Sequence, residues 1–474
     1  LGSLITGLLY ARFVARAAYG LGANIREAQY KHVQDFAFSN LDHFETSSLI
    51  TRMTTDVTVI QNAINGGLRP MIRGPVMLIM GIALSVYMNA KLSVVFFVST
   101  PILALILVFI VRKVAPMYRR LQKSMDHLNN VVQENLTAVR AVKAFVRGEY
   151  EEKKFQSVNG ELMQASQRTF HFAVLNLPAF QLMMYTAAVL IMWFGGNMII
   201  SSTLQVGELT GFLSYVLQVM NSLMMISNVF LLLTRSLASA QRINEVLSET
   251  TALSSPQNAC TVIHDGSVDF INVSFKYHED AEEYALSDVN LHIDAGQTVG
   301  ILGGTGSAKT TLVQLIPRLY DASIGEVYVG GKNVKDYSLA SLRDSVGIVL
   351  QKNVLFSGTV RENLLWGNGE ADDETIWQAC RAACADEFLS RMPGGLDTDL
   401  GQGGVNVSGG QKQRLCIART LLKKPKILIF DDSTSAVDTA TEAKIRSSLA
   451  KISDMTKIII AQRVTSVIDT DKII

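Results

Sequence analysis

Charged residues are scarce in this sequence. Asp, Glu, Lys and Arg make up 18% of the 474 residues, whereas hydrophobic residues make up 48%. Because a soluble globular domain usually carries about 25% charged residues, this balance favours a protein that inserts into a membrane. The formal net charge is +1, and no long run of one sign occurs. The composition therefore gives no indication of a nucleic-acid partner.

Cysteine is also rare. The sequence contains four cysteines, all in its second half: Cys260, Cys380, Cys384 and Cys416. Their spacing lacks the paired pattern of a small disulfide-rich domain, and we interpret them as reduced cytosolic thiols. Cys380 and Cys384 are four residues apart in WQACRAACADEF, which predicts two thiols on one helix face. A metal site is disfavoured there because no histidine lies nearby.

Four long uncharged stretches predict transmembrane helices. They cover residues 74–90, 92–111, 171–200 and 209–234. Crossing the roughly 30 Å hydrocarbon core takes about 20 helical residues, and these stretches lack the polar stripe of a soluble amphipathic helix. A shorter apolar stretch opens the chain. Arg12 and Arg16 follow it, so this fifth span is either shortened or begins before Leu1.

The connecting segments predict the orientation. Segments 89–91 and 201–208 are short, whereas 26–73 and 112–168 are long and rich in Lys and Arg. By the positive-inside rule, the long segments are cytoplasmic. Five spans that end inside must begin outside, so we expect Leu1 near the outer face and one further span before it. The absence of an initiator Met and the ending TDKII suggest a fragment.

The long cytoplasmic segments have a helical pattern of their own. Apolar residues recur at three- and four-residue intervals from Val132 to Val146. We therefore expect the spans to continue into the cytoplasm as helical stalks. Segments 41–48 and 144–154 fall where such stalks would turn. They are either simple hairpin turns or short stretches that dock on a soluble domain.

A polar segment separates two domains. Residues 250–266, TTALSSPQNACTVIHDG, are interpreted as a linker, which places the boundary near residue 248. Beyond it, short β-branched runs alternate with helical ones, as in an α/β domain with a largely parallel sheet. The predicted fold is a membrane all-α domain of long transmembrane helices with cytoplasmic stalks (1–248), followed by an α/β nucleotide-binding domain (249–474).

A glycine-rich loop predicts the nucleotide site. Residues 297–316, QTVGILGGTGSAKTTLVQLI, have the order strand, glycine loop, helix that is typical of a phosphate-binding P-loop. Backbone amides would cradle the β-phosphate of ATP, Lys309 would reach the β- and γ-oxygens, and Thr310 would ligate Mg²⁺. The loop comprises Gly303, Gly304, Thr305, Gly306, Ser307, Ala308, Lys309, Thr310 and Thr311.

One P-loop position departs from the pattern. The residue before the lysine is usually Gly, and here it is Ala308. Its methyl group could crowd the phosphate or the turn, but Gly303, Gly304 and Gly306 remain. We expect nucleotide binding to survive.

Two adjacent acids follow a buried apolar strand. Strand 427–430 delivers Asp431 beside the P-loop, where it would hold Mg²⁺ through water. Asp432 comes next. A buried Asp that caps a helix is the alternative role for either acid.

Between these motifs the sequence resembles the ATP-binding cassette (ABC) family. Ser408, Gly409, Gly410 and Gln411 match the family's signature, with Val407 in place of the usual Leu. Three further matches are Gln351 with the Q-loop, which contributes to the metal and catalytic sites, Ser435 to Asp438 with the D-loop, and Tyr277 with the residue that stacks on adenine. The resemblance extends over nearly the whole chain, because the spans and stalks look like an exporter-type membrane domain without its first helix.

The resemblance implies a dimer of two cassettes that sandwich two ATP molecules. Each ATP would be bound by the P-loop of one cassette and the signature of the other. ATP would hold the halves together and hydrolysis would release them. The membrane cavity would then open to alternate sides.

The resemblance also identifies two further departures. The family usually has Glu after the metal-binding Asp and His about 30 residues later, whereas this chain has Asp432 and Gln462. The shorter Asp displaces its carboxylate by about 1 Å, which can cost on the order of 10²-fold in rate, and Gln lacks the charge and exchangeable proton of an imidazole. Our hypothesis is that this site binds ATP but hydrolyses it slowly. A sister half-transporter would then supply the competent site, as in the degenerate-site subunit of heterodimeric bacterial multidrug exporters.

The function predicted first is ATP-driven export of hydrophobic or amphiphilic molecules across a plasma membrane, with the nucleotide-binding domain in the cytoplasm and membrane lipid around the spans. A bacterial source is expected. A lipid or peptide exporter is the alternative, since Met-rich stretches 181–185 and 222–227 could line an adaptable cavity, although core packing also explains them. A regulatory membrane protein gated by ATP binding is a further alternative.

Overall fold

The computed structural model describes residues 2–304, 306–432 and 438–474. They form two compact units. The first runs up to Lys31 and continues over Ser47–Ser248, and the second comprises His32–Thr46 and Glu249–Ile474. The first unit is helical and the second is α/β, so the predicted fold class is confirmed.

Helices of very different length build the first unit. They are α1 (Gly2–Gln34), α3 (Thr46–Thr51), π-helix η1 (Arg52–Asp56), α4 (Val57–Asn62), π-helix η2 (Ala63–Gly67), α5 (Leu68–Met88), α6 (Ala90–Thr137), α7 (Val139–Ala144), α8 (Gly148–Ala173), α9 (Asn176–Ile200) and α10 (Val206–Ser248). At 1.5 Å per residue, the 48 residues of α6 extend about 72 Å, more than twice the thickness of a bilayer core. The helices therefore continue well beyond their apolar parts.

Four helical stretches among the described residues are long and apolar enough to cross a membrane. They are Thr46–Met88, Ala90–Thr137, Gly148–Ile200 and Val206–Ser248. Each stretch contains one of the four predicted spans, except that residues 89 and 90 of the predicted span 74–90 lie beyond the end of the first stretch. Helix α1 does not belong to this set. The predicted span 171–200 is interrupted by a turn at Val174 and Leu175, between α8 and α9.

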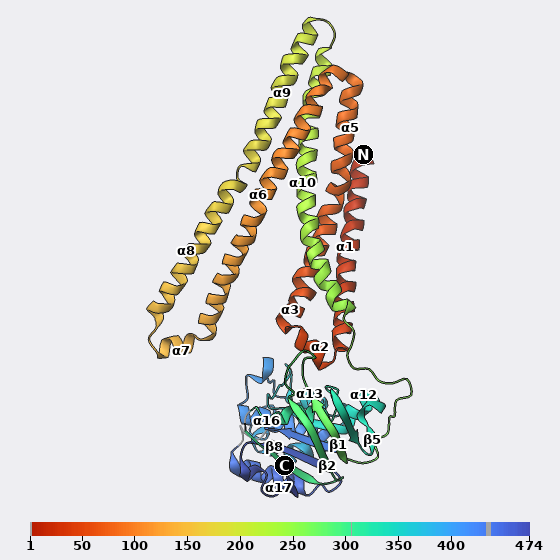
Figure 1. The fold of residues 1–474 in the computed structure, drawn as a ribbon, viewed down its shortest axis with the longest axis vertical. Helices are drawn as coiled ribbons and strands as arrows, with labels where there is room; N and C mark the ends of the chain where they lie inside the picture. Colours follow the sequence, from red (N-terminus) through yellow and green to blue (C-terminus); the bar gives the residue numbers. More distant parts are fainter. Residues whose placement is uncertain (1, 305, 433–437) are drawn as a thin grey trace. The chain divides into compact units, whose positions relative to one another are not determined.

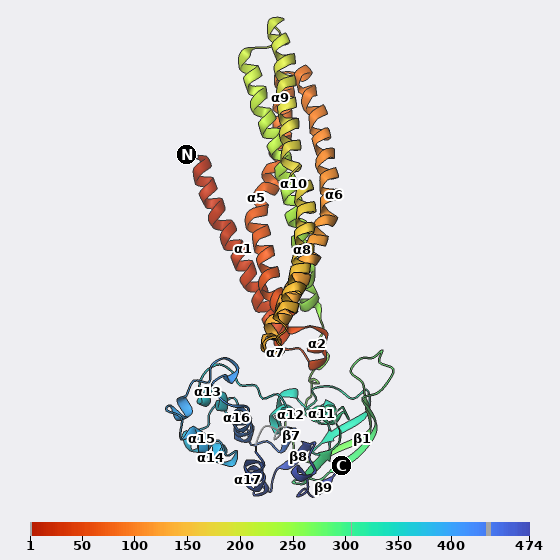
Figure 2. The ribbon, with the colours of Figure 1, turned by 90° about the vertical axis from the view of Figure 1, so that its left-hand side faces the viewer.

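The helices of this unit pack in two antiparallel pairs. Helix α6 lies beside α8 and α9, with α7 joining the pair at one end, and α5 packs along α10 (Figures 1 and 2). Buried side chains of α6, α9 and α10, including Phe96, Ile191 and Phe212, form the core. Met183 and Met224 of the Met-rich stretches pack against this core.

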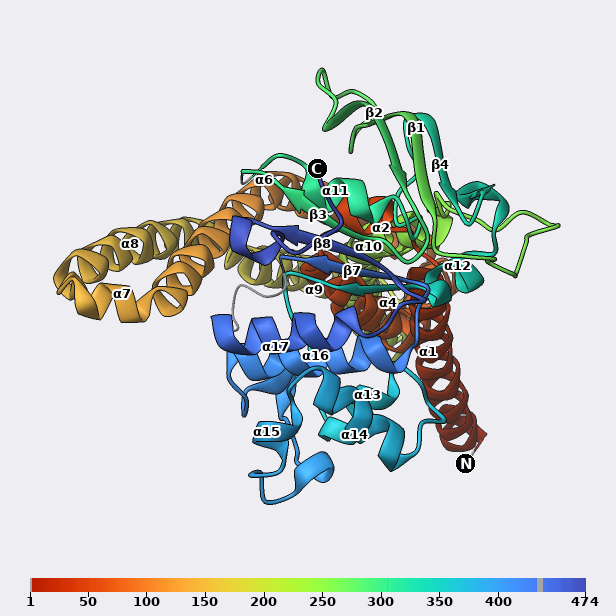
Figure 3. The same cartoon turned by 90° about the horizontal axis from the view of Figure 1, so that it is seen from below.

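The second unit contains two sheets. Its elements are α2 (Phe38–His43), β1 (Val268–Phe275), β2 (Leu286–Ile293), β3 (Thr298–Leu302), α11 (Lys309–Gln314), β4 (Ile324–Val329), β5 (Lys332–Asn333), η3 (Val334–Asp336), α12 (Leu339–Ser345), β6 (Val346–Val349), α13 (Val360–Leu365), α14 (Asp373–Ala382), α15 (Asp386–Leu389), η4 (Gly395–Asp397), η5 (Gln402–Gly404), α16 (Gly409–Leu422), β7 (Ile427–Asp431), α17 (Thr439–Ala450), β8 (Thr456–Ala461), η6 (Val464–Ser466) and β9 (Lys472–Ile473). One sheet is antiparallel, in the order β2-β1-β4-β5, and the other is parallel, in the order β6-β7-β8-β3-β9 (Figure 3).

The parallel sheet is covered on both faces. Ile427 and Ile429 of β7 pack into the apolar cluster around α11, whereas Leu428 and Phe430 pack into the cluster around α14 and α16. Successive strand residues point to opposite faces, and this accounts for the continuous apolar run of β7. The carboxyl ends of β3, β6, β7 and β8 meet at one edge, and the loops that follow them carry the predicted nucleotide-binding residues.

The short helix α2 packs within the second unit, against residues far along the chain. Tyr320 Oη donates a hydrogen bond of 2.6 Å to Asp42 Oδ2, and the Tyr320 and Phe38 ring centroids lie 6.1 Å apart. Asn40 is 5% exposed and its Nδ2 donates to Glu249 Oε1 at 2.8 Å. The first predicted turn thus contacts the nucleotide-binding domain. The second forms the α7–α8 hairpin of the first unit.

Candidate nucleotide-binding site

The glycine loop folds around the lysine that ends it. Between β3 and α11, Lys309 Nζ donates to the carbonyl oxygens of Gly303 and Gly304 at 2.9 and 2.7 Å, and to Ser307 Oγ at 3.2 Å. The ammonium group is thereby held inside the loop, where phosphate oxygens would exchange for these carbonyls. Thr305 lies outside the described residues.

Ala308 has a left-handed backbone, with φ of 56° and ψ of 22°. Only glycine adopts this region routinely, and other residues pay roughly 1–2 kcal/mol. The alanine side chain packs, partly buried, against the apolar cluster that includes Val299 and Leu312. The structure therefore shows a backbone cost of this substitution, and the crowding of a phosphate by the methyl group stays a prediction.

A hydroxyl and a carboxylate face each other at the end of β7. Thr310 Oγ1 donates a hydrogen bond of 2.8 Å to Asp431 Oδ1, and Asp431 is 4% exposed. Burial raises the pKa of the Asp431 carboxyl, and the bond from Thr310 opposes this shift. Hydroxyl and carboxylate oxygens are ligands that Mg²⁺ prefers, so this pair fits the ion. The described residues contain no cluster of three or more His, Cys, Asp or Glu that could hold a metal.

The structure brings the three predicted catalytic residues together at one oxygen atom. Gln462 Nε2 donates to Asp432 Oδ2 at 2.8 Å, and Gln351 Nε2 lies 3.5 Å from the same oxygen. Asp432 has a φ of 45°, and its N–H donates to the Ile460 carbonyl at 3.1 Å. Amide N–H groups donate hydrogen bonds but do not exchange a proton as an imidazole does. The arrangement holds the Asp432 carboxylate without providing a proton shuttle.

Tyr277 lies beside the helix that follows the loop. Its Oη is 2.8 Å from Thr311 Oγ1, and 44% of the residue is exposed. The ring packs edge-on against Phe275 and Tyr320, with centroids 4.9 and 5.4 Å away. An exposed aromatic ring in a fixed position suits stacking on a nucleotide base.

Sequence reasoning missed Tyr320. This residue links the Tyr277 ring to Asp42, and burial raises the pKa of its phenol, with the bond to Asp42 adding to the shift. No sequence signal could have identified it, because its partner in α2 is 278 positions away and no motif surrounds either residue.

The signature residues begin helix α16. Ser408 is the N-cap: its Oγ accepts from the Gln411 N–H at 3.4 Å, while its own N–H donates to Gln411 Oε1 at 2.9 Å. This reciprocal capping box satisfies two of the unpaired donors of the first turn. Gly409 and Gly410 complete that turn and Val407 is buried in the domain core. No described hydrogen bond joins this turn to the P-loop. Among the D-loop residues, 435–437 lie outside the described residues, and Asp438 caps α17 through a bond from the Thr441 N–H.

Comparisons with known proteins match both domains. The family model "ABC transporter transmembrane region" matches residues 1–223, and the model "ABC transporter" matches residues 286–435. The chain is 39% identical over 472 residues to the uncharacterized ABC transporter ATP-binding protein YfiB of Bacillus subtilis, covering 100% of this chain and 82% of that protein. It is 30% identical to the ATP-dependent lipid A-core flippase of Desulfotalea psychrophila, covering 98% and 81%.

Two further similarities concern export. The putative multidrug export ATP-binding/permease protein YgaD of Bacillus subtilis is 31% identical, with 95% of this chain and 78% of that protein covered. The structure of a bacterial Atm1-family ABC exporter with ATP bound superposes with a TM-score of 0.83 at 25% identity, covering 99% and 82% of the two chains. The chain therefore belongs to the ABC transporter family, as an exporter half-transporter in which a multi-pass membrane domain is fused to a cytoplasmic ATPase domain.

Proposed function

We propose that this chain is the degenerate-site subunit of a heterodimeric ABC exporter that moves hydrophobic or amphiphilic molecules, with multidrug efflux as the leading possibility. Its own ATP site binds Mg·ATP and hydrolyses it slowly, and its signature completes the competent site of a sister half-transporter. The observation that best supports slow hydrolysis is the 2.8 Å hydrogen bond from Gln462 to Asp432. These two residues occupy the positions where the family usually has His and Glu.

Nucleotide binding at the chain's own site rests on groups that it retains. In this proposal Lys309 and the amides of Gly303 to Thr311 bind the phosphates and Tyr277 stacks on the base. Thr310 and Asp431, which are hydrogen-bonded to each other, hold Mg²⁺ with Gln351. Each of these contacts stabilises bound ATP and requires neither a general base nor an imidazole. Binding is therefore retained when the hydrolytic residues change.

Slow hydrolysis follows from how Asp432 is held. The carboxylate is one methylene shorter than that of Glu, and its Oδ2 already accepts a hydrogen bond from Gln462. An oxygen that accepts an amide N–H is less available to orient or deprotonate the attacking water. A displacement of about 1 Å at this position can lower the rate on the order of 10²-fold.

The signature favours a heterodimer. Ser408 and the two glycines offer a hydroxyl and free amides at the start of the 14-residue helix α16, which is a favourable arrangement for a γ-phosphate. In a homodimer both ATP sites would combine this intact signature with Asp432 and Gln462. A sister subunit with Glu and His at those positions gives one site that hydrolyses rapidly.

ATP hydrolysis tests this proposal. The full-length protein is purified alone and as a pair with its sister half-transporter, with a Lys309→Ala variant as the control for its own site. We expect fast turnover only in the pair, abolished by replacing the sister's catalytic Glu and only reduced by Lys309→Ala. Turnover by the single protein at the rate of the pair would show an ordinary homodimeric pump and would refute the proposal.

Lipid export is the second candidate, favoured by the 30% identity to a relative named as a lipid flippase. The same purified pair in vesicles distinguishes the two. A lipid exporter moves a fluorescent phospholipid between leaflets in an ATP-dependent manner, whereas a multidrug exporter concentrates cationic dyes and leaves the lipid distribution unchanged.

A further inference from the structure

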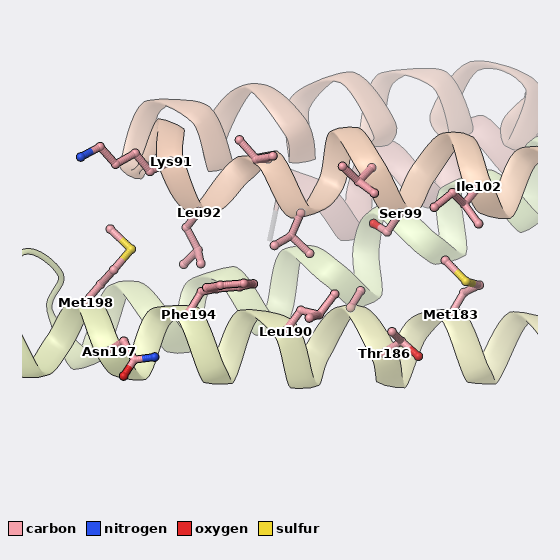
Figure 4. Close-up of a pocket in the computed structure, with 14 residues that line it drawn as sticks. Lys91, Leu92, Ser99, Ile102, Met183, Thr186, Leu190, Phe194, Asn197 and Met198 are labelled. Atoms are coloured by element: carbon pink, nitrogen blue, oxygen red, sulfur yellow. The ribbon is translucent and has the colours of Figure 1, made fainter.

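An apolar groove runs between α6 and α9, within the membrane unit. Its volume is about 790 Å³, within the range of about 300–1,000 Å³ that is typical of ligand pockets. Figure 4 shows the two helices side by side, with side chains such as Ile102, Met183, Leu190 and Phe194 along the groove. Its walls are apolar except for a few hydroxyl and amide groups and one cation, Lys91.

The groove lies at the outer end of the membrane unit. Because α10 leads into the cytoplasmic ATPase domain, the start of α10 and the end of α9 lie on the opposite side of the membrane. Helix α6 runs antiparallel to α9, so its first residues lie on that outer side as well. Lys91, Asn197 and Met198 are found together at this end, and Ile102 and Met183 at the other (Figure 4).

The length of the groove corresponds to one leaflet. From Lys91 to Ile102, α6 rises about 16 Å, and half of the hydrocarbon core measures about 15 Å. A fatty acyl chain of the outer leaflet would therefore fill the groove from the headgroup level to the bilayer centre. The exposure of Val98 (54%) and Phe194 (50%) leaves apolar surface for such a chain to cover.

Lys91 supplies a positive charge at the level of a lipid headgroup. It takes part in none of the ion pairs formed among the described residues. Its backbone is fixed, because Asn89 Oδ1 accepts hydrogen bonds from the N–H groups of Lys91 and Leu92 at 3.1 Å. A cation in this position complements a phosphate, whereas a purely apolar occupant would have no use for it.

We propose that the groove between α6 and α9 is a binding site for an anionic phospholipid of the outer leaflet. One acyl chain lies along Val98, Leu190 and Phe194, and the headgroup phosphate pairs with Lys91. Burial of an acyl chain is favourable for every lipid in a bilayer, so it does not discriminate between headgroups. Selection of an anionic lipid therefore depends on Lys91.

Trp193 provides the readout. It is 70% exposed, neighbours Phe194 on α9, and is the only tryptophan before residue 248. Replacing Trp366 and Trp377 by Phe leaves it as the sole fluorophore. The full-length protein is placed in nanodiscs that contain phospholipids with brominated chains, which quench nearby tryptophan, and either a phosphatidylglycerol or a phosphatidylcholine headgroup.

We expect the brominated anionic lipid to quench Trp193 at a severalfold lower mole fraction than the zwitterionic lipid. Lys91→Gln should abolish this preference and Lys91→Arg should keep it. Arg112→Gln, just beyond the apolar span 92–111 of α6 and on its cytoplasmic side, is the matched control and should leave the preference unchanged. Val98→Phe, which fills the groove, should weaken quenching by both lipids. Unchanged ATP binding by each variant verifies its fold.

Three results would overturn the proposal. Equal quenching by both headgroups in the parent protein would mean that only ordinary boundary lipid is present. A preference that survives Lys91→Gln would place the selection elsewhere. Absence of quenching by either lipid would mean that another protein segment, such as the second subunit, covers the groove.

Discussion

The two parts of the ATP-binding chemistry differ within this single chain. At the edge of the parallel sheet, Ala308, Asp432 and Gln462 depart from the family pattern, whereas Ser408 to Gln411 at the start of α16 keep both their sequence and their capping box. Under the proposed function, all three departures belong to the chain's own ATP site, whereas the signature serves the partner's site. The proposal then implies that nucleotide binding and completion of a neighbouring site are retained while local hydrolysis is weakened.

The largest expected effect comes from a double substitution, Asp432→Glu with Gln462→His, which gives the chain's own site the residues that the family usually has. It lengthens the carboxylate by one methylene and restores an imidazole, and we expect turnover at this site to rise on the order of 10²-fold. The measurement is ATP hydrolysis by the pair in which the sister's catalytic Glu is replaced by Gln, so that only this site reports. Adding Lys309→Ala should remove the gain. Turnover that stays slow would mean that neither geometry nor the proton shuttle limits this site.

A second substitution tests whether the signature of this chain contributes to ATP hydrolysis at the sister's site. Ser408→Ala removes a hydroxyl that we expect to contact the γ-phosphate at the sister's site, a charge-assisted bond of about 1.5 kcal/mol, so pair turnover should fall about tenfold. The change also removes an N-cap, which costs about 1 kcal/mol of stability. Asp372→Ala deletes the equivalent cap of α14 and serves as the control. If both variants lose turnover equally, Ser408 acts only as a cap.

The contact of α2 with the ATPase domain gives a smaller expected effect. Tyr320→Phe removes the hydrogen bond to the exposed Asp42, worth about 1 kcal/mol, and should increase amide hydrogen exchange in Phe38–His43 about fivefold. Tyr328→Phe, which removes a surface hydroxyl bonded to Glu326, is the matched control. Unchanged exchange would indicate that ring packing against Phe38 holds α2 without the hydroxyl.

Local patterns predicted the elements whose signals are local. The glycine loop between β3 and α11 and the four apolar spans were predictable because glycine spacing and uncharged runs directly reflect phosphate binding and bilayer thickness. The bond between Asp432 and Gln462 joins residues 30 apart, and that between Asp42 and Tyr320 joins residues 278 apart. Such pairings depend on tertiary packing. Even Cys384, predicted on a helix face with Cys380, lies beyond the end of α14 with a φ of 54°.

The smallest expected effect concerns Ala308, whose left-handed φ could not be predicted from its identity. Ala308→Gly relieves a backbone cost of roughly 1–2 kcal/mol, part of which is offset because glycine loses more freedom on folding. A net gain of about 0.7 kcal/mol should raise the stability of the folded domain, because the strain belongs to the folded loop itself. Turnover should stay slow, because Asp432 and Gln462 are unchanged. Chemical denaturation of the two proteins measures the gain. Ala340→Gly, inside helix α12, is the control and should weaken stability instead. Faster hydrolysis by Ala308→Gly alone would mean that the loop backbone, rather than the Asp432–Gln462 pair, sets the rate.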